Sequence, residues 1–297
     1  MALWNLFFSS VLLPLIGIAL LGRRRGVPRA GWVATLILAG GLTAFSFFAA
    51  PWGLLGVPLR WALALLFVIA TVVSIRRPAD PEAGQESPFR MIGKIAIGLF
   101  FGSVGAGALA ARSVEGPTIE LTMPLRGGTF LVAHGGSTPA ANVYAGHPTQ
   151  GLAVDFTKLN AAGLRARGFA PSALEKYAVY GSAVVSPCAG TVIVAIDGLA
   201  DNVPPARDEK SAGGNQVVLR CGDAEVHLEH LQRGSVAVKA GAAVGRGAPL
   251  GRAGNSGNST EPHLHIYATR GNHALGMTFD GRWLVRNATV RRELLPG

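Results

Sequence analysis

The chain is poor in charge: charged residues make up 15% of its 297 positions, whereas hydrophobic residues make up 49%. That balance excludes an ordinary single soluble domain of this length. The chain has only two cysteines, Cys188 and Cys221, which are too far apart for a Cys-x-x-Cys metal clamp. No strand–Gly-x-Gly-x-x-Gly–helix pattern is present, which excludes a phosphate loop of that kind. None of the seven histidines precedes residue 130, so histidine chemistry is confined to the later part of the chain.

The first third is instead dominated by long apolar runs. Each is close to the ~20 residues that a helix needs to cross a bilayer. The runs cover residues 3–21, 30–50, about 54–75 and about 91–111, and Pro58 and Arg60 interrupt the start of the third. One such run is also compatible with a buried core helix, but four in succession with short connections are typical of a membrane domain. We therefore expect residues 1–112 to form an α-helical membrane anchor of about four helices, and residues 113–297 an exported domain.

Basic residues predict how these helices are oriented. The first and third connections carry Arg23, Arg24, Arg25 and Arg29, and Arg76, Arg77, Arg90 and Lys94, respectively, whereas the second has only Arg60 at its edge. Positive charge follows the first run and does not precede it, which argues against a cleavable signal peptide. By the positive-inside rule, the first and third connections are cytoplasmic and both termini are outside. This topology accounts for most of the net charge of +10, so the charge requires no nucleic-acid partner.

After Arg112 the composition changes to short β-branched segments separated by Gly, Pro, Asn and Asp. This pattern predicts an all-β antiparallel sandwich or barrel-like domain. The expected strands cover residues 182–186, 191–196, 216–221, 225–231, 236–238 and 263–268. The capping-box pattern Ser172-Ala173-Leu174-Glu175 predicts a short helical insertion toward Tyr180. A Cys188–Cys221 disulfide fits an exported location, and two buried free thiols are the alternative.

Two of the histidines, His263 and His265, follow a Gly/Asn/Ser-rich loop. In a strand, His263 and His265 project from the same face and Leu264 points into the core. Strict alternation places His227 on the opposite face from His230, toward the surface. Four sequence elements follow one another: 147–156 (HPTQGLAVDF), 181–192 (GSAVVSPCAGTV), 227–231 (HLEHL) and 254–265 (GNSGNSTEPHLH).

This order of elements resembles the lysostaphin/LytM-type zinc metallopeptidases, enzymes that cut peptide bonds in bacterial peptidoglycan. The resemblance spans roughly residues 122–287 and includes the Val-x-x-Gly-x-x-Val-x-x-Gly rhythm of residues 238–247. It implies that Asp155 and His265 ligate Zn²⁺ and that His230 and His263 act on the attacking water and the developing oxyanion. Imidazole is suited to that role because its pKa lies near neutrality.

The resemblance also implies a third ligand, a histidine four residues before the aspartate, but that position is Gly151. His147, eight residues upstream of Asp155, is the expected replacement, and His134 is the fallback. A site with only two ligands is the remaining alternative.

The resemblance and the anchor together predict a zinc endopeptidase on the outer face of the bacterial cytoplasmic (inner) membrane. Its expected partners are peptidoglycan and the lipid bilayer, with no nucleic acid. One rival is a non-catalytic LytM-like domain that binds the wall or activates another hydrolase. The other is a sensor or transport accessory, which would need charged residues within its spans; these spans lack them apart from Arg60 and Lys94 near the ends. Small residues such as Gly40-Gly41 could pack helices together, and the sequence leaves a homo-oligomer or a regulatory membrane partner undetermined.

Overall fold

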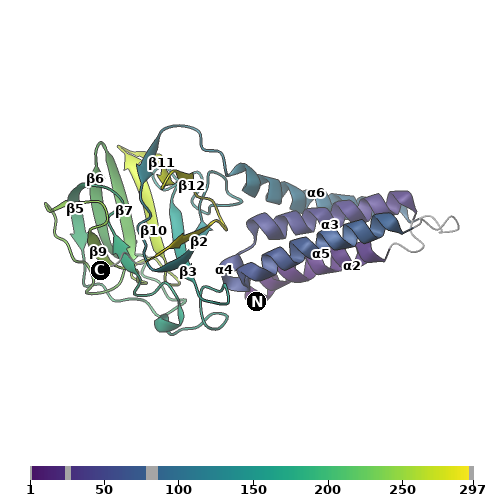
Figure 1. Cartoon of the computed structure of the whole chain (residues 1–297), viewed down its shortest axis with the longest axis horizontal. Helices are drawn as coiled ribbons and strands as arrows, with labels where there is room; N and C mark the ends of the chain where they lie inside the picture. Colours follow the sequence, from purple (N-terminus) through teal and green to yellow (C-terminus); the bar gives the residue numbers. More distant parts are fainter. Residues whose placement is uncertain (1, 24–27, 78–85, 294–297) are drawn as a thin grey trace. The chain divides into compact units, whose positions relative to one another are not determined.

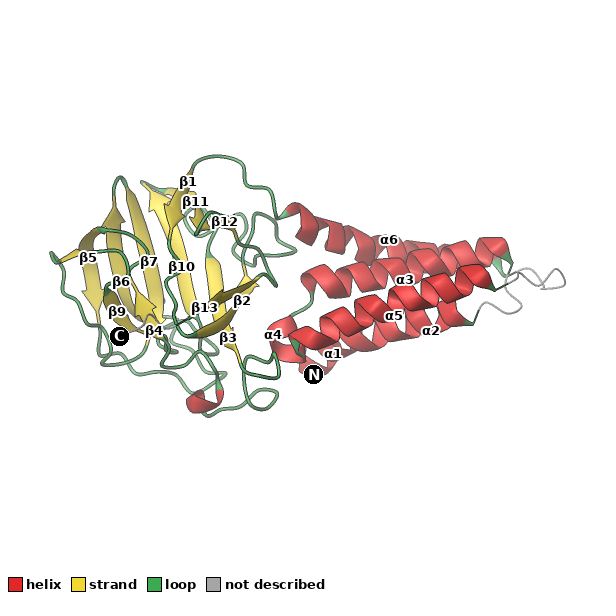
Figure 2. Cartoon of the chain, in the orientation of Figure 1, coloured by secondary structure: helices red, strands yellow, loops and turns green. Residues whose placement is uncertain are grey.

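The computed structural model describes residues 2–23, 28–77 and 86–293, with the side chains of residues 2 and 3 left out. Arg24 and Arg25, which contribute to the predicted orientation, lie outside the described residues. The chain divides into two compact units, Met1–Ala110 and Ala111–Gly297. The first is helical and the second is built mainly from strands (Figures 1 and 2).

The first unit confirms the expected helices. They are α1 (Ala2–Phe7), continued by a π-helical turn (Phe8–Leu12) and α2 (Leu13–Gly22), then α3 (Arg29–Ala49), α4 (Trp52–Leu55), α5 (Val57–Arg76) and α6 (Pro88–Ala110). Among the described residues, four segments are long and apolar enough to cross a membrane: Trp4–Gly22, Arg29–Ala49, Val57–Arg76 and Pro88–Ala110. Pro58 does not break α5. It lies in the first turn of that helix, where no intrahelical N–H is needed.

Large apolar side chains cover the outward faces of this unit. Leu65 on α5 is 60% exposed, and Leu99 and Phe100 on α6 are 62% and 64% exposed. Side chains of this size at such density are unfavourable in water, and a lipid environment removes that penalty.

Two cations within the helices, Arg60 and Lys94, have partners in the helical unit. The Arg60 guanidinium lies 4.0 Å from the centre of the Phe47 ring and is largely buried. The Lys94 ammonium donates to the Glu86 carboxylate at 2.6 Å and to the Thr35 hydroxyl at 3.0 Å. Neither cation is therefore left without compensation inside the helix bundle.

Helices α3 and α6 pack through glycine. A Cβ atom placed on Gly41 would lie 1.9 Å from the Gly98 carbonyl oxygen, and one on Gly105 would lie 2.8 Å from the Ala44 carbonyl carbon. Only a residue without a side chain lets two helix backbones approach so closely.

The second unit is the expected β domain. Its strands are β1 (Thr118–Leu121), β2 (Gly128–His134), β3 (Val154–Leu159), β4 (Ala183–Val185), β5 (Gly190–Ile196), β6 (Asn215–Cys221), β7 (Ala224–Leu231), β8 (Ala243–Val244), β9 (Pro249–Arg252), β10 (Leu264–Arg270), β11 (His273–Phe279), β12 (Arg282–Trp283) and β13 (Thr289–Arg292). The main sheet has the order β13-β2-β3-β10-β7-β6-β5-β8, and β11 extends it beside β10. Strands β4 and β9 form a separate pair. Of the described strand pairs, only β1–β11 is parallel.

The core of this unit lies on one face of the main sheet. Phe130, Phe156, Leu219, Leu228 and Leu264 are completely buried there. Leu264 points into this core as predicted, so its neighbours in the sequence face the opposite side of the sheet. Cys188 and Cys221 form a disulfide that links the start of β5 to the end of β6, which confirms the predicted pairing.

Two local predictions are wrong. Residues 236–238 form no strand, because their apolar side chains pack against the core without a partner strand and only Ala237 bonds to the backbone of β9. The helical insertion is a single 3₁₀ turn, Leu174–Lys176, and no side chain caps it. It ends there because Tyr177 forms a β-bridge with Ala166.

Candidate metal centre

Four polar side chains form a row across the sheet face opposite the core. His265 on β10 stands directly opposite Asp155 on β3 and, on its other side, opposite Glu229 on β7. Asp155 in turn stands opposite His134 on β2. A β-bulge at Ala133 produces this last pairing, because without the extra residue Ala133 itself would face Asp155.

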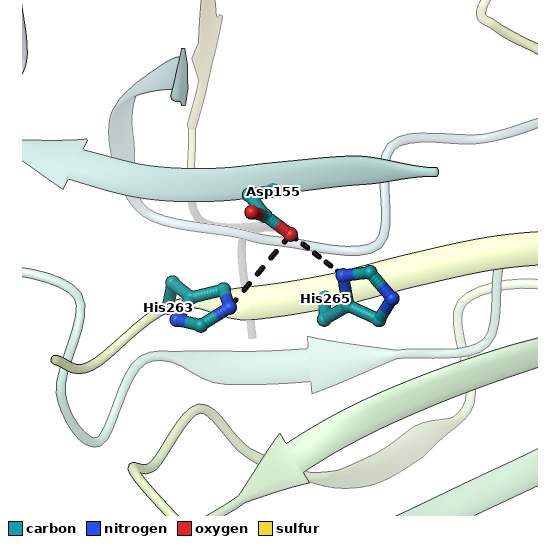
Figure 3. Close-up of side chains that lie close together, drawn as sticks. All are labelled: Asp155, His263 and His265. Atoms are coloured by element: carbon teal, nitrogen blue, oxygen red, sulfur yellow. Dashed lines mark hydrogen bonds and ion pairs between the residues drawn. The ribbon is translucent and has the colours of Figure 1, made fainter. Parts of the chain in front are cut away.

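Among the described His, Cys, Asp and Glu side chains, one group could hold a metal ion: Asp155, His263 and His265. Their ligand atoms all lie within 4.8 Å of one another. The Asp155 Oδ1 atom lies 2.6 Å from His265 Nδ1 and 3.7 Å from His263 Nε2. Figure 3 shows both imidazoles directed at the carboxylate from the neighbouring chain segment. Two nitrogens and a carboxylate oxygen are donors that zinc accepts.

The orientation of His263 supports a bound cation. Its Nδ1 lies 2.8 Å from the Glu261 carbonyl oxygen, so Nδ1 carries the proton and donates it there. Nε2 then presents a lone pair toward the carboxylate of Asp155. That nitrogen is buried and has no hydrogen-bond partner. Two electron-rich atoms facing each other in a buried site are stabilised by a positive ion between them.

His230 reaches the same site through an unusual backbone conformation. Its φ is +63°, in the left-handed region that few non-glycine residues adopt. The register of β6 and β7 shifts at this point, which places the His230 ring 4.9 Å from that of His263 and 5.7 Å from that of His265. Its Nδ1 lies 2.9 Å from the Ser256 carbonyl oxygen. A proton on Nδ1 therefore leaves Nε2 as an acceptor.

The same shift explains why the prediction for His227 is wrong. His227 lies on the same face as His265, because it pairs across the sheet with Tyr267 and stacks on its ring with centroids 4.2 Å apart. Strict alternation fails at His230, which is turned onto that face by its left-handed backbone.

Burial controls the ionisation of the site. Burial would raise the pKa of Asp155, but His263 and His265 in their protonated forms, together with the hydrogen bond from His265, outweigh it, so the pKa is lowered. Burial, with His263 and His265 nearby, lowers the pKa of His230 well below its usual value. Burial also raises the pKa of Glu229. At neutral pH the centre thus holds an ionised aspartate beside a neutral His230.

A cleft of about 340 Å³ opens onto Asp155 and His263. Tyr144, Arg207 and Glu261 also line it, so it offers charged groups of both signs. Glu261 is held by Arg165, whose Nε and Nη2 atoms donate to its two carboxylate oxygens at 2.7 and 2.6 Å.

The structure does not bring His147 into this group. His147 lies exposed in the loop before β3, where its Nδ1 accepts hydrogen bonds from the backbone N–H groups of Thr149 and Gln150. His134 lines the cleft, and its Nδ1 accepts from Arg286 at 3.1 Å. Burial and the Arg286 charge lower the pKa of His134 to about 4.

Sequence reasoning missed Tyr144 and Glu229. Glu229 stood within the HLEHL element, and its cross-strand pairing with His265 follows from the strand register. No spacing pattern marks Tyr144, because its place depends on how the loop between β2 and β3 folds.

Residues 173–276 match peptidase family M23. The chain contains an M23 peptidase domain. The matched segment includes His230, His263 and His265, whereas Asp155 lies before it. No curated protein matches the chain.

Several solved structures resemble part of this chain. A zinc-containing peptidase from Vibrio cholerae is 21% identical over 52% of this chain and 39% of its own, with a TM-score of 0.31. The catalytic domain of the antimicrobial peptidase lysostaphin from Staphylococcus simulans is 19% identical over 56% of this chain and 86% of its own, with a TM-score of 0.27. Csd3 of Helicobacter pylori is 18% identical over 63% of this chain and 39% of its own, with a TM-score of 0.32. The chain therefore spans well under half the length of the Vibrio and Helicobacter proteins.

Proposed function

We propose that this protein is a membrane-anchored zinc endopeptidase that hydrolyses peptide bonds in the stems or cross-bridges of peptidoglycan. The observation that carries the proposal is the convergence of Asp155, His263, His265 and His230 in an M23 domain, beside a cleft that opens onto Asp155 and His263. A fold alone would not support an activity, but these side chains offer both a metal site and groups that move protons.

Asp155 Oδ1 and His265 Nδ1 are the atoms that would hold the ion, since both residues are buried; the ion would replace the hydrogen bond that joins these atoms at 2.6 Å. Bound zinc polarises a carbonyl and makes water a nucleophile near neutral pH. Zinc is favoured over harder ions because imidazole nitrogen contributes to the donor set.

His230 and His263 supply the proton chemistry. Neutral His230 can accept a proton from the attacking water at Nε2 and return it to the leaving amine, while Ser256 fixes its ring through Nδ1. His263 is fixed in the same way by the Glu261 carbonyl, and its Nε2 faces the carboxylate of Asp155. In its protonated form His263 would stabilise negative charge on the substrate carbonyl oxygen.

The cleft suits a charged peptide. Arg207 can pair with a substrate carboxylate in exchange for Glu209, whose Oε1 lies 2.6 Å from Arg207 Nη2. Glu261, although held by Arg165, keeps lone pairs for a substrate ammonium group. Peptidoglycan stems carry both kinds of group, which supports them as the substrate.

The second candidate is a non-catalytic domain that binds the wall or activates another hydrolase. The observation that favours it is Gly151 at the position where the resembling enzymes have a ligand histidine.

The four apolar helices support a membrane anchor, and the arginines of the first and third connections support an outer location for the M23 domain. Cutting peptidoglycan requires that location, because the wall lies outside the membrane.

Metal content tests the metal centre. Full-length protein in lipid nanodiscs, loaded with zinc and desalted, is expected to hold about one zinc per chain by mass spectrometry. Asp155→Asn and His265→Gln should lose it. His227→Gln is the matched control, since His227 lies on the same sheet face but contacts Tyr267. A folded wild type that retains no zinc would leave the non-catalytic candidate.

A further inference from the structure

The proposed zinc site is short of one protein ligand. Catalytic zinc usually has three, and the position expected to supply the third is Gly151. The backbone explains why no histidine stands there. Gly151 N donates to the His147 carbonyl oxygen at 2.9 Å, and a Cβ atom on Gly151 would lie 2.7 Å from that same oxygen. A side chain at residue 151 would collide with that oxygen in this turn, so a third ligand would come from elsewhere.

Tyr144 contacts both residues proposed as ligands. Its hydroxyl donates to Asp155 Oδ2 at 3.2 Å. Its ring lies against that of His265, with centroids 4.8 Å apart. The side chain also lines the cleft that opens onto Asp155. Tyr144 thus brings a phenol oxygen to the centre, in addition to the His, Asp and Glu donors already described.

A buried amide fixes Tyr144 in this place. Asn142 is 1% exposed, and its Nδ2 lies 3.0 to 3.2 Å from the carbonyl oxygens of Gly136, Gly151 and Ala153. Its Oδ1 accepts from the backbone N–H of Tyr144 at 3.0 Å. The loop between β2 and β3 is therefore tied together immediately beside the tyrosine, which positions the phenol in advance of binding.

His263 belongs to the same group as the proposed ligands, but the proposed function assigns its Nε2 to the substrate carbonyl oxygen. The two histidines that remain, His147 and His134, are less well placed. His147 is exposed, and its Nδ1 is already engaged by backbone N–H groups. The His134 ring lies 6.3 Å from that of Tyr144, and His134 is not among the side chains whose ligand atoms lie within 4.8 Å of one another.

We propose that Tyr144 is the third protein ligand of the metal, replacing the histidine that the resembling enzymes have. This inference rests on the proposed function. Burial and the Asp155 carboxylate raise the pKa of Tyr144, so the phenol keeps its proton until a cation binds. On metal binding, the Oη–H bond breaks, Oη bonds to the cation and the proton leaves to solvent, as occurs for other ligands that bind deprotonated. The ligand set becomes one imidazole nitrogen and two anionic oxygens.

Copper spectroscopy on the full-length protein in nanodiscs tests this directly. A phenolate bound to Cu²⁺ gives a visible charge-transfer band that neither imidazole nor carboxylate produces. We expect this band in the wild type and its loss in Tyr144→Phe, which keeps the ring against His265. Tyr144→His should bind Cu²⁺ without the band. A hydroxyl that merely orients Asp155 would give no band in any variant.

Zinc affinity, measured by competition with a chelator, gives the second readout. We expect the Kd to rise at least ~100-fold in Tyr144→Phe, because losing an outer hydrogen-bond partner alone costs 10–100-fold. His147→Gln and His134→Gln should bind like the wild type. Unchanged affinity in Tyr144→Phe and no charge-transfer band would overturn the tyrosine ligand while leaving the metal centre intact. A wild type that binds neither ion would overturn the proposed function as well.

Discussion

His230 is the residue whose conformation does most to assemble the site. A left-handed backbone at a histidine is unfavourable by about 1–3 kcal/mol and persists only where the surroundings enforce it. Here the β6–β7 register shift and the bond to the Ser256 carbonyl do so. The conformation brings His230 onto the face that already carries Glu229 and His265.

Replacing His230 by asparagine should remove the proton carrier and spare the fold, since asparagine tolerates the left-handed region. We expect kcat on purified peptidoglycan to fall by ~10²–10⁴-fold with zinc content unchanged. The measurement is the initial rate of amine release, with His227→Gln as the control. Full activity in His230→Asn would assign the proton transfer to another group.

Among single residues, the sequence predicts those that lie in compact motifs. The candidate residues Asp155, His263 and His265 are adjacent in the structure because strand pairing fixes their positions. Tyr144 could not be predicted, because a loop and the buried Asn142 determine where its hydroxyl lies. His227 was misplaced because alternation assumes an unbroken strand.

Helix packing in the first unit depends on single glycines. A Cβ atom on Gly98 of α6 would lie 2.5 Å from the Ile37 carbonyl oxygen, whereas one on Gly93 of the same helix would meet nothing within 4 Å. The two positions thus form a matched pair, one inside the α3–α6 contact and one outside it.

Gly98→Ala should destabilise the helical unit by ~1–3 kcal/mol through overpacking. Gly93→Ala should be neutral or stabilising by up to ~1 kcal/mol, because alanine favours a helix. The measurement is the temperature at which the monodisperse peak of the full-length protein in detergent falls to half of its starting height. Equal midpoints for the two variants would contradict the close α3–α6 contact.

Element by element, periodicity predicts the long features well. The apolar runs became helices, and the β-branched runs around β5, β6, β7 and β10 became strands. Residues 236–238 failed because β-branched residues also pack against a core without pairing, and the strand beside them, β9, pairs with β4. The capping-box pattern at Ser172 failed because the bridge between Tyr177 and Ala166 competes with further helix.

For the molecule as a whole, the proposal joins an anchor to a hydrolase outside the membrane. Alkaline phosphatase fused after residue 297 should be active in growing bacteria, because that enzyme folds only on the outer side. A fluorescent protein fused at the same point should stay dark when exported unfolded. The reverse pattern would contradict the assigned orientation and remove the M23 domain from its proposed substrate.

Mass spectrometry of peptidoglycan treated with the zinc-loaded, full-length protein tests the proposed amide hydrolysis. We expect peptide fragments that differ from their precursors by one added water across an amide bond. These should vanish in Asp155→Asn and after chelation, and should return when zinc is restored to the wild type. Intact peptide stems and cross-bridges after treatment with folded, zinc-loaded wild type would contradict the account.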